Sequence, residues 1–253
     1  MSGPGYALIF NNINFDGAPN ISSGKSDKKA IVKFLECFKI KYSYHEDLTK
    51  AEIERVMKKV EKTNFTRHSC IIIFILSHGD RTSIISAKDT KYNLEDTIIF
   101  SLLRNGSLDE KPKFLFIDTC KGKNTPEKIR NEDTNEQRYP GQCVQSQIHD
   151  LHKPDFLLTF YSTYEGFVSY YDDRDGSVFT QTLCQHLVKY GHDRSLMYII
   201  EKVMEAVKIS KNGKQSPCLT TNYFGSYCFG DYLSESSSFS EFLNTKFTLK
   251  KKT

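Results

Sequence analysis

A cysteine and a histidine each follow an apolar run of strand type, and together they have the chemistry of a nucleophile and its base. Ile71 to Leu76 is apolar throughout and leads to Ser77-His78-Gly79, and the shorter run Phe114 to Ile117 leads to Asp118-Thr119-Cys120. An imidazole beside a thiol takes up its proton and produces the thiolate of a cysteine peptidase. Gly79 and the Cys120 amide would donate N–H groups to the oxyanion, because glycine lets the main chain approach the substrate carbonyl.

The segments around these residues predict that both side chains meet at one edge of a sheet. Apolar strand-type runs alternate with helical periodicity, which predicts an α/β fold with a mainly parallel sheet and ligands beyond the carboxyl ends of its strands. The spacing predicts strands at 6–11, 41–44, 69–76, 114–117, 156–161 and 217–222. It predicts helices that start at an Asp27 cap and at a Thr49–Glu52 capping box, and others at 94–103, 178–190 and 196–208.

Composition excludes several other classes of function. The longest apolar run has 6 residues, Ile71 to Leu76, whereas a membrane span needs about 20. The net charge is +4 with the basic residues spread along the chain, which disfavours nucleic acid as a partner. The 7 cysteines are odd in number and form no CxxC pair, so we expect free thiols in a cytoplasmic protein. His149 and His152 flank Asp150 but have no cysteine close by, so we expect neither a metal nor a cofactor.

A polar segment divides the chain into two α/β parts. Residues 123–153 contain Pro126, Pro140 and Gly141 and show no sustained period, as is typical of an exposed linker. We therefore expect a first part at 1–122, a linker at 123–153 and a second part at 154–233. The serine-rich, lysine-ended segment 234–253 reads as a flexible tail.

The sequence motifs around Cys120 and His78 resemble those of the caspase family. Its signature is Q-A-C-[RQG]-G with a histidine about 50 residues upstream; this chain has Asp118-Thr119-Cys120-Lys121-Gly122 with His78 42 residues before Cys120. Further matches follow in family order: Tyr6 to Phe15, Asp47-Leu48-Thr49, Leu76 to Gly79, Lys111 to Phe114, Pro154 to Thr163, Asp175-Gly176-Ser177 and Gln215 to Cys218.

The resemblance implies a caspase-like three-layer sandwich with a central sheet of about six strands. Residues 1–122 would be the large-subunit-like part and 154–233 the small-subunit-like part. Two such units would pair through the last strand, at Pro217, Cys218, Leu219, Thr220 and Thr221. The resemblance also implies proteolysis after aspartate, and maturation by cleavage in the linker, for which Asp133 and Asp150 are candidates.

The residues that would bind the substrate aspartate are substituted. In the resembled family two arginines and a glutamine surround that carboxylate. Here the first arginine position falls on Ile21 or Ser22, the glutamine is replaced by Asp118, and the second arginine position holds Tyr171. Lys25 lies three or four residues from the first position, where a solvated loop lysine is the simpler interpretation.

These substitutions have a large expected cost. Truncating one partner of a buried charge pair costs about 2 to 5 kcal/mol, and tyrosine cannot replace the bidentate geometry of arginine. Two carboxylates about 4 Å apart repel by up to about 4 kcal/mol at an effective dielectric near 20, so Asp118 would also oppose an acidic substrate side chain. The family arginine replaced by Tyr171 also anchors the substrate main chain, so alignment of any peptide is affected.

Two hypotheses follow. The first is a caspase homologue with impaired or absent aspartate-specific activity. It would regulate apoptosis by forming a heterodimer with a catalytic caspase and modulating it, with activation expected; pairing with itself is the other option. The second is an active cysteine endopeptidase with a non-acidic preference at the residue before the cut (P1), because Cys120 and His78 are retained. Neither involves nucleic acid, a membrane or a cofactor.

Overall fold

A six-stranded sheet forms the centre of the molecule. The computed structural model describes residues 2–80, 83–122, 124–125 and 155–233. The strand order is β11-β8-β7-β3-β1-β2, and all neighbours are parallel except β11, which is antiparallel to β8. The strands are β1 (Tyr6–Asn11), β2 (Lys41–Glu46), β3 (Ile71–Leu76), β7 (Lys113–Asp118), β8 (Leu157–Tyr161) and β11 (Cys218–Thr221). The prediction of a mainly parallel α/β sheet is confirmed.

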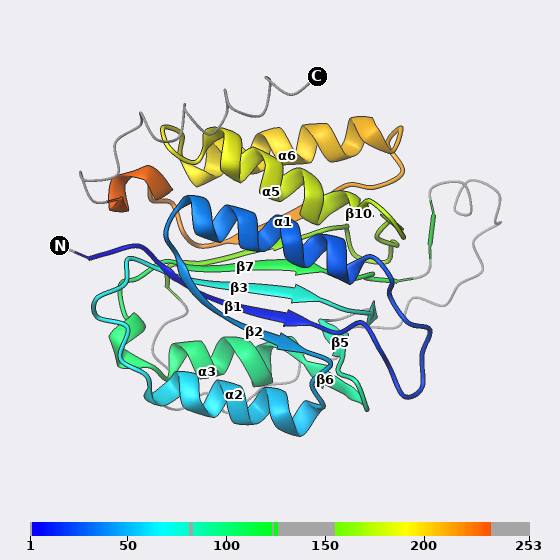
Figure 1. Ribbon diagram of the computed structural model, residues 1–253, viewed down its shortest axis with the longest axis horizontal. Coiled ribbons are helices and arrows are strands. Elements are labelled where there is room, and N and C mark those ends of the chain that lie inside the picture. Colours follow the sequence, from blue (N-terminus) through cyan, green and yellow to red (C-terminus); the bar gives the residue numbers. More distant parts are fainter. Residues whose placement is uncertain (1, 81–82, 123, 126–154, 234–253) are drawn as a thin grey trace, which may run out of the picture.

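Helices cover both faces of this sheet (Figure 1). One face carries α1 (Gly24–Cys37), α5 (Val178–Tyr190) and α6 (Leu196–Ser210), and the other carries α2 (Lys50–Lys62) and α3 (Phe100–Leu103). Along β1, Ala7 and Ile9 enter the first core, whereas Leu8 and Phe10 enter the second. Burial on both faces explains why the central strands are apolar throughout rather than alternating.

The start of α2 agrees with the prediction from the sequence, whereas the start of α1 does not. Thr49 caps α2 through the predicted reciprocal hydrogen bonds with Glu52. In α1 the N-cap is Ser23, so the expectation that Asp27 caps the helix is wrong. Asp27 lies in the first turn and is buried, because its carboxylate faces inward and accepts a hydrogen bond from the main-chain N–H of Ser177.

Several short elements have no signal in the sequence, because two or three residues cannot establish a period. Two small antiparallel sheets are formed by such strands, β4-β5-β6 and β9-β10. The bounds of these strands are β4 (Gly79–Asp80), β5 (Ile84–Ser86), β6 (Lys91–Asn93), β9 (Tyr171–Asp172) and β10 (Gly176–Ser177). The helix predicted at 94–103 consists of a π-helix (Glu95–Ile99) followed by α3, and two 3-10 helices span Gly106–Leu108 and Phe229–Tyr232.

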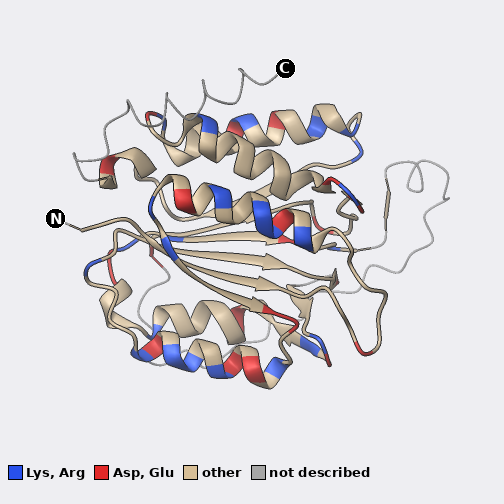
Figure 2. Ribbon diagram, in the orientation of Figure 1, with Lys and Arg blue, Asp and Glu red and all other residues tan. Residues whose placement is uncertain are grey.

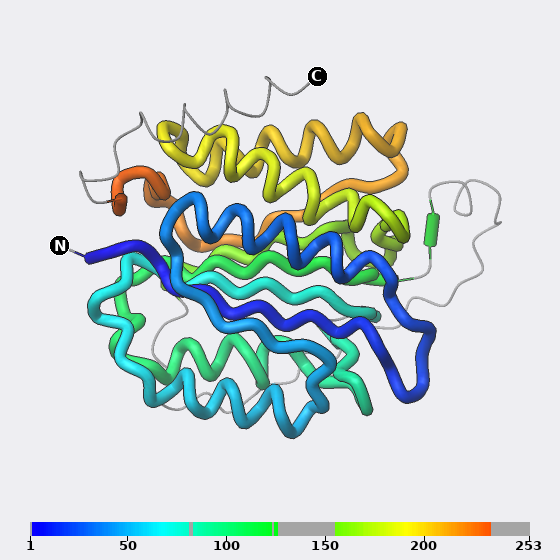
Figure 3. The backbone as a smooth tube through the Cα atoms, viewed as in Figure 1, coloured from blue at the N-terminus to red at the C-terminus, as the bar shows by residue number. Residues whose placement is uncertain are grey.

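Most of the charged side chains lie along the helices and loops (Figure 2), although Lys113 and Asp118 are buried at the two ends of β7. The chain trace in Figure 3 shows that the N-terminal strand runs inside the sheet, next to strands from later in the chain. No described helix is long and apolar enough to cross a membrane. Most of the expected linker and all of the expected tail, with Asp133, Asp150 and the His149–His152 cluster, lie outside the described residues.

Candidate active site

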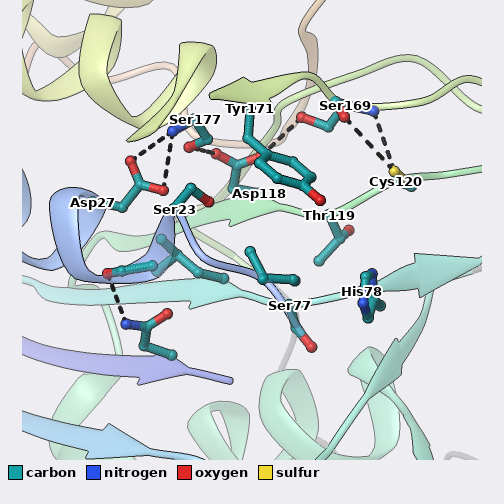
Figure 4. A pocket seen from close by; sticks show the side chains of 14 residues that line it. Ser23, Asp27, Ser77, His78, Asp118, Thr119, Cys120, Ser169, Tyr171 and Ser177 are labelled. Atoms are coloured by element: carbon teal, nitrogen blue, oxygen red, sulfur yellow. Dashed lines mark hydrogen bonds between the residues drawn. The ribbon is translucent and has the colours of Figure 1, made fainter. Parts of the chain in front are cut away.

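The register of the sheet brings His78 and Cys120 to the same edge. Strands β3 and β7 are parallel neighbours in which Leu76 is paired with Asp118. His78 lies two residues after Leu76, and Cys120 lies two residues after Asp118. Both residues therefore lie at the carboxyl edge of the sheet (Figure 4). The proximity expected from two separate apolar runs is therefore present in the structure.

A main-chain carbonyl holds the imidazole of His78. The Nε2 atom lies 2.7 Å from the carbonyl oxygen of Pro19. A carbonyl oxygen only accepts, so Nε2 carries the proton and donates, which leaves Nδ1 as the basic nitrogen. The ring of Phe15 packs beside the imidazole, with 4.7 Å between ring centroids. The loop after β1 thus fixes the tautomer that a base needs.

The thiol of Cys120 is held by Ser169. The Ser169 N–H donates to Sγ over 3.3 Å, and Sγ lies 3.9 Å from the Ser169 carbonyl oxygen. Burial raises the pKa of Cys120, the Ser169 N–H lowers it, and the negative charge of Asp118 raises it. Among the described residues, Sγ makes its hydrogen bonds to Ser169 and none to His78.

Gly79 permits the close approach of the two strand ends. A Cβ atom added to Gly79 would lie 2.3 Å from the carbonyl oxygen of Cys120 and 2.7 Å from Cβ of Thr119. No side chain can occupy that space. The position proposed from sequence as an oxyanion donor is therefore also a packing requirement of the edge that carries Cys120.

Asp118 is buried and bound by hydroxyl groups alone. It is 9% exposed, and Oδ2 accepts a hydrogen bond from Thr180 Oγ1 at 2.7 Å and another from Ser177 Oγ. Its Oδ1 accepts a hydrogen bond from Ser169 Oγ at 2.9 Å. Neutral donors stabilise a carboxylate less than an arginine does. No described cation thus contacts this carboxyl group at the base of the pocket.

A second buried carboxylate, that of Asp27, lies next to Asp118. Asp27 is 1% exposed; its Oδ1 accepts hydrogen bonds from the Ser177 N–H at 2.9 Å and from Gln181 Nε2 at 2.8 Å. Burial, followed by the charge of Asp118, raises the pKa of Asp27 from 3.8 to about 7. Ser177 therefore joins the two carboxyl groups, with its N–H on Asp27 and its hydroxyl on Asp118.

The remaining substituted positions lie around the mouth of this pocket. Ile21 and Tyr171 line it, and the described lining residues include no lysine or arginine. Ser22 is exposed and donates its hydroxyl hydrogen bond to Asp173. Lys25 is exposed on α1 and is not part of the lining. The hollow has a volume of about 50 Å³, whereas ligand pockets commonly measure about 300 to 1,000 Å³.

Several contributors to the site have no local sequence signal. The residues that hold Asp118, Asp27 and His78 are distant in the sequence: Pro19 and Ser169 lie in loops, and Thr180 and Gln181 lie in the first turn of α5. The Asp175-Gly176-Ser177 motif indicates a helix start, and Ser177 is the N-cap of α5. Its hydroxyl, however, turns to Asp118 instead of to the helix.

The expected pairing strand forms one edge of the sheet. β11 covers Cys218 to Thr221, of which Thr220 is exposed, and Pro217 lies just before the strand. On its inner side Leu219 is paired with Phe160 of β8. No other described strand pairs with the outer side of β11. Within the described residues, no group of three or more His, Cys, Asp or Glu side chains could hold a metal ion.

The arrangement defines the class of protein. A three-layer α/β sandwich presents a cysteine and a tautomer-fixed histidine at the carboxyl edge of neighbouring parallel strands, which is the equipment for thiolate attack on a carbonyl. The fold and the positions of His78 and Cys120 are thus those expected of a cysteine-peptidase-type protein.

Comparison with known proteins identifies the family. A family model described as "Caspase domain" matches residues 4–226. Caspase drICE of Drosophila melanogaster is 29% identical over 232 residues, covering 86% of this chain and 67% of the relative; caspase-3 of Mus musculus is 28% identical over 230 residues, covering 86% and 80%. The crystal structure of caspase-1 from Spodoptera frugiperda matches with a TM-score of 0.76 at 23% identity, covering 91% of this chain and 92% of that one. The chain belongs to the caspase family.

Proposed function

We propose that this caspase homologue has little or no aspartate-specific protease activity and regulates apoptosis by pairing with a catalytic caspase, whose activity it raises. The observation that carries this proposal is the base of the pocket beside Cys120. It holds Asp118, bound by hydroxyls, and Asp27 next to it. An aspartate side chain entering there would meet two acidic residues and no described cation.

The electrostatic cost of such a substrate is large compared with what the pocket offers. Removing the cationic partner of a buried carboxylate costs about 2 to 5 kcal/mol, which corresponds to roughly 30-fold to several thousand-fold in affinity. Tyr171, 48% exposed at the pocket mouth, offers no second cation. Binding of a partner, rather than turnover, is then the function that the intact scaffold supports.

The outer edge of β11 is the surface that we propose for this pairing. An edge strand presents main-chain N–H and C=O groups that a second strand can bind. Phe224 lies three residues after β11 and is 90% exposed. A large exposed apolar side chain that closely follows an edge strand in the sequence fits the aromatic composition expected at the centre of an interface. Contact at this edge would order the active-site loops of the partner by binding only their folded arrangement.

Mixing the protein with a panel of active caspases tests the proposal. We expect a 1:1 or 2:2 complex by light scattering after gel filtration, together with faster peptide hydrolysis by the caspase. The Cys120→Ala variant should act equally well, because the effect does not need its thiol. An absence of both association and rate change across the panel would reject the proposal.

A pair of matched variants locates the interface. Phe224→Asp should weaken the complex about 30-fold, since a central aromatic anchor contributes about 2 kcal/mol or more. Ile209→Asp is the control, because Ile209 is also a large exposed apolar residue, 68% exposed, at the far end of α6. Equal affinities for the two variants would exclude the β11 edge as the pairing surface.

The alternative function is a cysteine endopeptidase with a non-acidic preference at P1. The specific observation in its favour is the same pair, Asp27 and Asp118, because a negative pocket attracts a lysine or arginine side chain. The adjacent His78 and Cys120 could then cleave the peptide. Profiling a peptide library with wild type and Cys120→Ala separates the two functions: cleavage after basic residues that disappears in the variant would establish the alternative.

A further inference from the structure

A second cavity lies outside the active site, between helices α1 and α5. It has a volume of about 520 Å³, within the range of small-molecule sites and about ten times that of the hollow beside Cys120. Both helices belong to the same layer, on one face of the sheet (Figure 1).

The wall formed by α1 is one continuous face of that helix. Its lining residues are Ser26, Lys29, Ala30 and Lys33. They follow the i, i+3, i+4, i+7 spacing that places side chains in a row along a helix. Ala30 packs against the core below, whereas Lys29 and Lys33 are exposed one turn apart. This wall therefore has an apolar base and a basic rim.

The wall formed by α5 has the same construction. Its lining residues are Gln181, Cys184, Gln185, Val188 and Lys189, again a single helical face. Cys184 is 2% exposed and Val188 packs against the core, so the floor of the groove is apolar. Burial raises the pKa of Cys184 well above that of a free thiol, which keeps the floor uncharged. Lys189 is exposed on the rim.

The two helices run in the same direction, so Lys33 and Lys189 lie toward one end of the groove, whereas Lys29 lies one turn nearer its start. At the start of the helices, Gln181 Nε2 donates to Asp27 Oδ1 at 2.8 Å. At their ends, a Cβ atom on Gly191 would lie 2.7 Å from the ring of Phe38. Lys33 and Lys189 therefore lie at the same end of the groove, and Gln181 marks the end nearer the pocket beside Cys120.

No described acidic side chain neutralises this rim. Helix α5 contains no aspartate or glutamate, and the exposed acid of α1 is Glu36. None of the ion pairs in the described part of the chain involves Lys29, Lys33 or Lys189. Lys189 contacts only an aromatic face, with Nζ 4.6 Å from the ring centroid of Tyr190. The cations remain available to a ligand.

We propose that this groove binds a soluble small molecule with an apolar body and one anionic group, such as a medium-chain alkyl phosphate or carboxylate. The apolar body lies over Ala30, Cys184 and Val188, and the anionic group lies between Lys33 and Lys189, with Lys29 close to it. A compact cavity with walls on two sides is suited to a single small molecule. A membrane-binding site would instead need a broad convex or flat face on the protein.

Calorimetric titration with a series of eight-carbon probes tests both halves of the ligand. Octyl phosphate and octanoate should bind with a dissociation constant of about 0.1 mM, a value typical of ligands of about a dozen non-hydrogen atoms. Inorganic phosphate, octanol and octylamine should bind at least tenfold more weakly, because each lacks the apolar body or the negative charge. Equal binding of octylamine and octyl phosphate would overturn the proposal.

Variants place the ligand in this groove. Lys33→Gln with Lys189→Gln should weaken octyl phosphate about tenfold. The matched control is Lys58→Gln with Lys62→Gln on α2, across the sheet, which should leave the affinity unchanged. The chain contains no tryptophan, so Gln185→Trp adds a single fluorescent reporter at the rim whose emission should change on titration. Equal affinity of the two double variants would contradict the proposal, and so would binding confined to phosphatidic acid vesicles.

Discussion

Asp118 lies at the base of the pocket beside Cys120, where we propose that the family places a donor for the substrate aspartate, and its partners are three hydroxyl groups. Its charge acts on Cys120 as well as on a substrate. The thiolate is the reactive form of a cysteine, and a nearby negative charge raises the pKa of the thiol. In our proposal, Asp118 thus opposes acidic substrates and also makes the Cys120 thiol harder to ionise.

Replacing this carboxylate should make Cys120 ionise more readily. In Asp118→Asn the midpoint of the pH dependence of Cys120 alkylation by iodoacetamide should move to lower pH, because the variant removes one of the causes that raise the pKa of the thiol. Peptide mass spectrometry identifies the alkylated residue. Asp173→Asn, at an exposed position of the pocket mouth, serves as the control. An unchanged midpoint in Asp118→Asn would show that the Asp118 charge does not reach the thiol.

The raised pKa of Asp27 has a consequence for stability. A carboxyl group whose pKa is near 4 in the unfolded chain and about 7 in the folded protein binds its proton more tightly when folded. Between these values the folded state holds more protons than the unfolded state, so the free energy of unfolding falls as pH rises. A rise of this size corresponds to about 4 kcal/mol in total, as an upper figure for a buried group that neighbours a second carboxylate.

Asp27→Asn should remove this pH dependence. Urea unfolding of the wild-type protein should give a lower free energy of unfolding at pH 7.5 than at pH 5, and the difference between the two pH values should shrink in the variant. The Asn oxygen can still accept from the Ser177 N–H. Asp16→Asn, at an exposed loop residue, should behave like wild type. If Asp27→Asn and wild type change in parallel with pH, the two carboxyl groups are not coupled as described.

The elements that carry the site pack so closely at the carboxyl edge of β3 and β7 that Gly79 has no room for a side chain. Gly79, which starts β4, lies against the main chain of Cys120. The strand register, the small sheet β4-β5-β6 and the loop of Cys120 are therefore coupled through one residue without a side chain.

A single added methyl group should disrupt that contact. Gly79→Ala should lower the free energy of unfolding by about 1 to 3 kcal/mol, the usual cost of overpacking, because backbone atoms lie 2.3 Å from the new Cβ. Gly17→Ala is a matched control, since nothing lies within 4 Å of a Cβ there, and it should be neutral or slightly stabilising. Equal melting temperatures for the two variants would mean that the edge can shift to accommodate a side chain.

The sequence predicted most of the helices and strands, but it did not predict the side-chain contacts between distant segments. The buried runs before His78 and Cys120 predicted their strands, and parallel pairing then required the two residues to meet. The prediction that Asp27 caps the helix is wrong because α1 begins one turn earlier, with Ser23 as its N-cap. Its partner Ser177 is 150 residues away in the chain. Such contacts depend on how α1 and α5 pack, and no local pattern encodes that packing.

At the scale of the whole molecule, the caspase fold is present, and our proposal places the difference in function at one pocket. The six-stranded sheet, both helical layers, His78 and Cys120 are present, and the positions that we propose to be altered, Ile21, Ser22, Asp118 and Tyr171, lie in or beside one pocket. The open edge of β11 and the groove between α1 and α5 lie outside that pocket. Our proposals assign partner binding to the edge and ligand binding to the groove, so each is testable without catalysis.

Hydrolysis of a peptide library by the isolated protein, measured for wild type beside Cys120→Ala, tests the central claim most directly. The claim is that a pocket with buried carboxylates and no described cation does not accept a P1 aspartate. We predict that cleavage after aspartate by wild type equals the background of the variant. Cleavage after aspartate that is efficient in wild type and absent in Cys120→Ala would contradict the account.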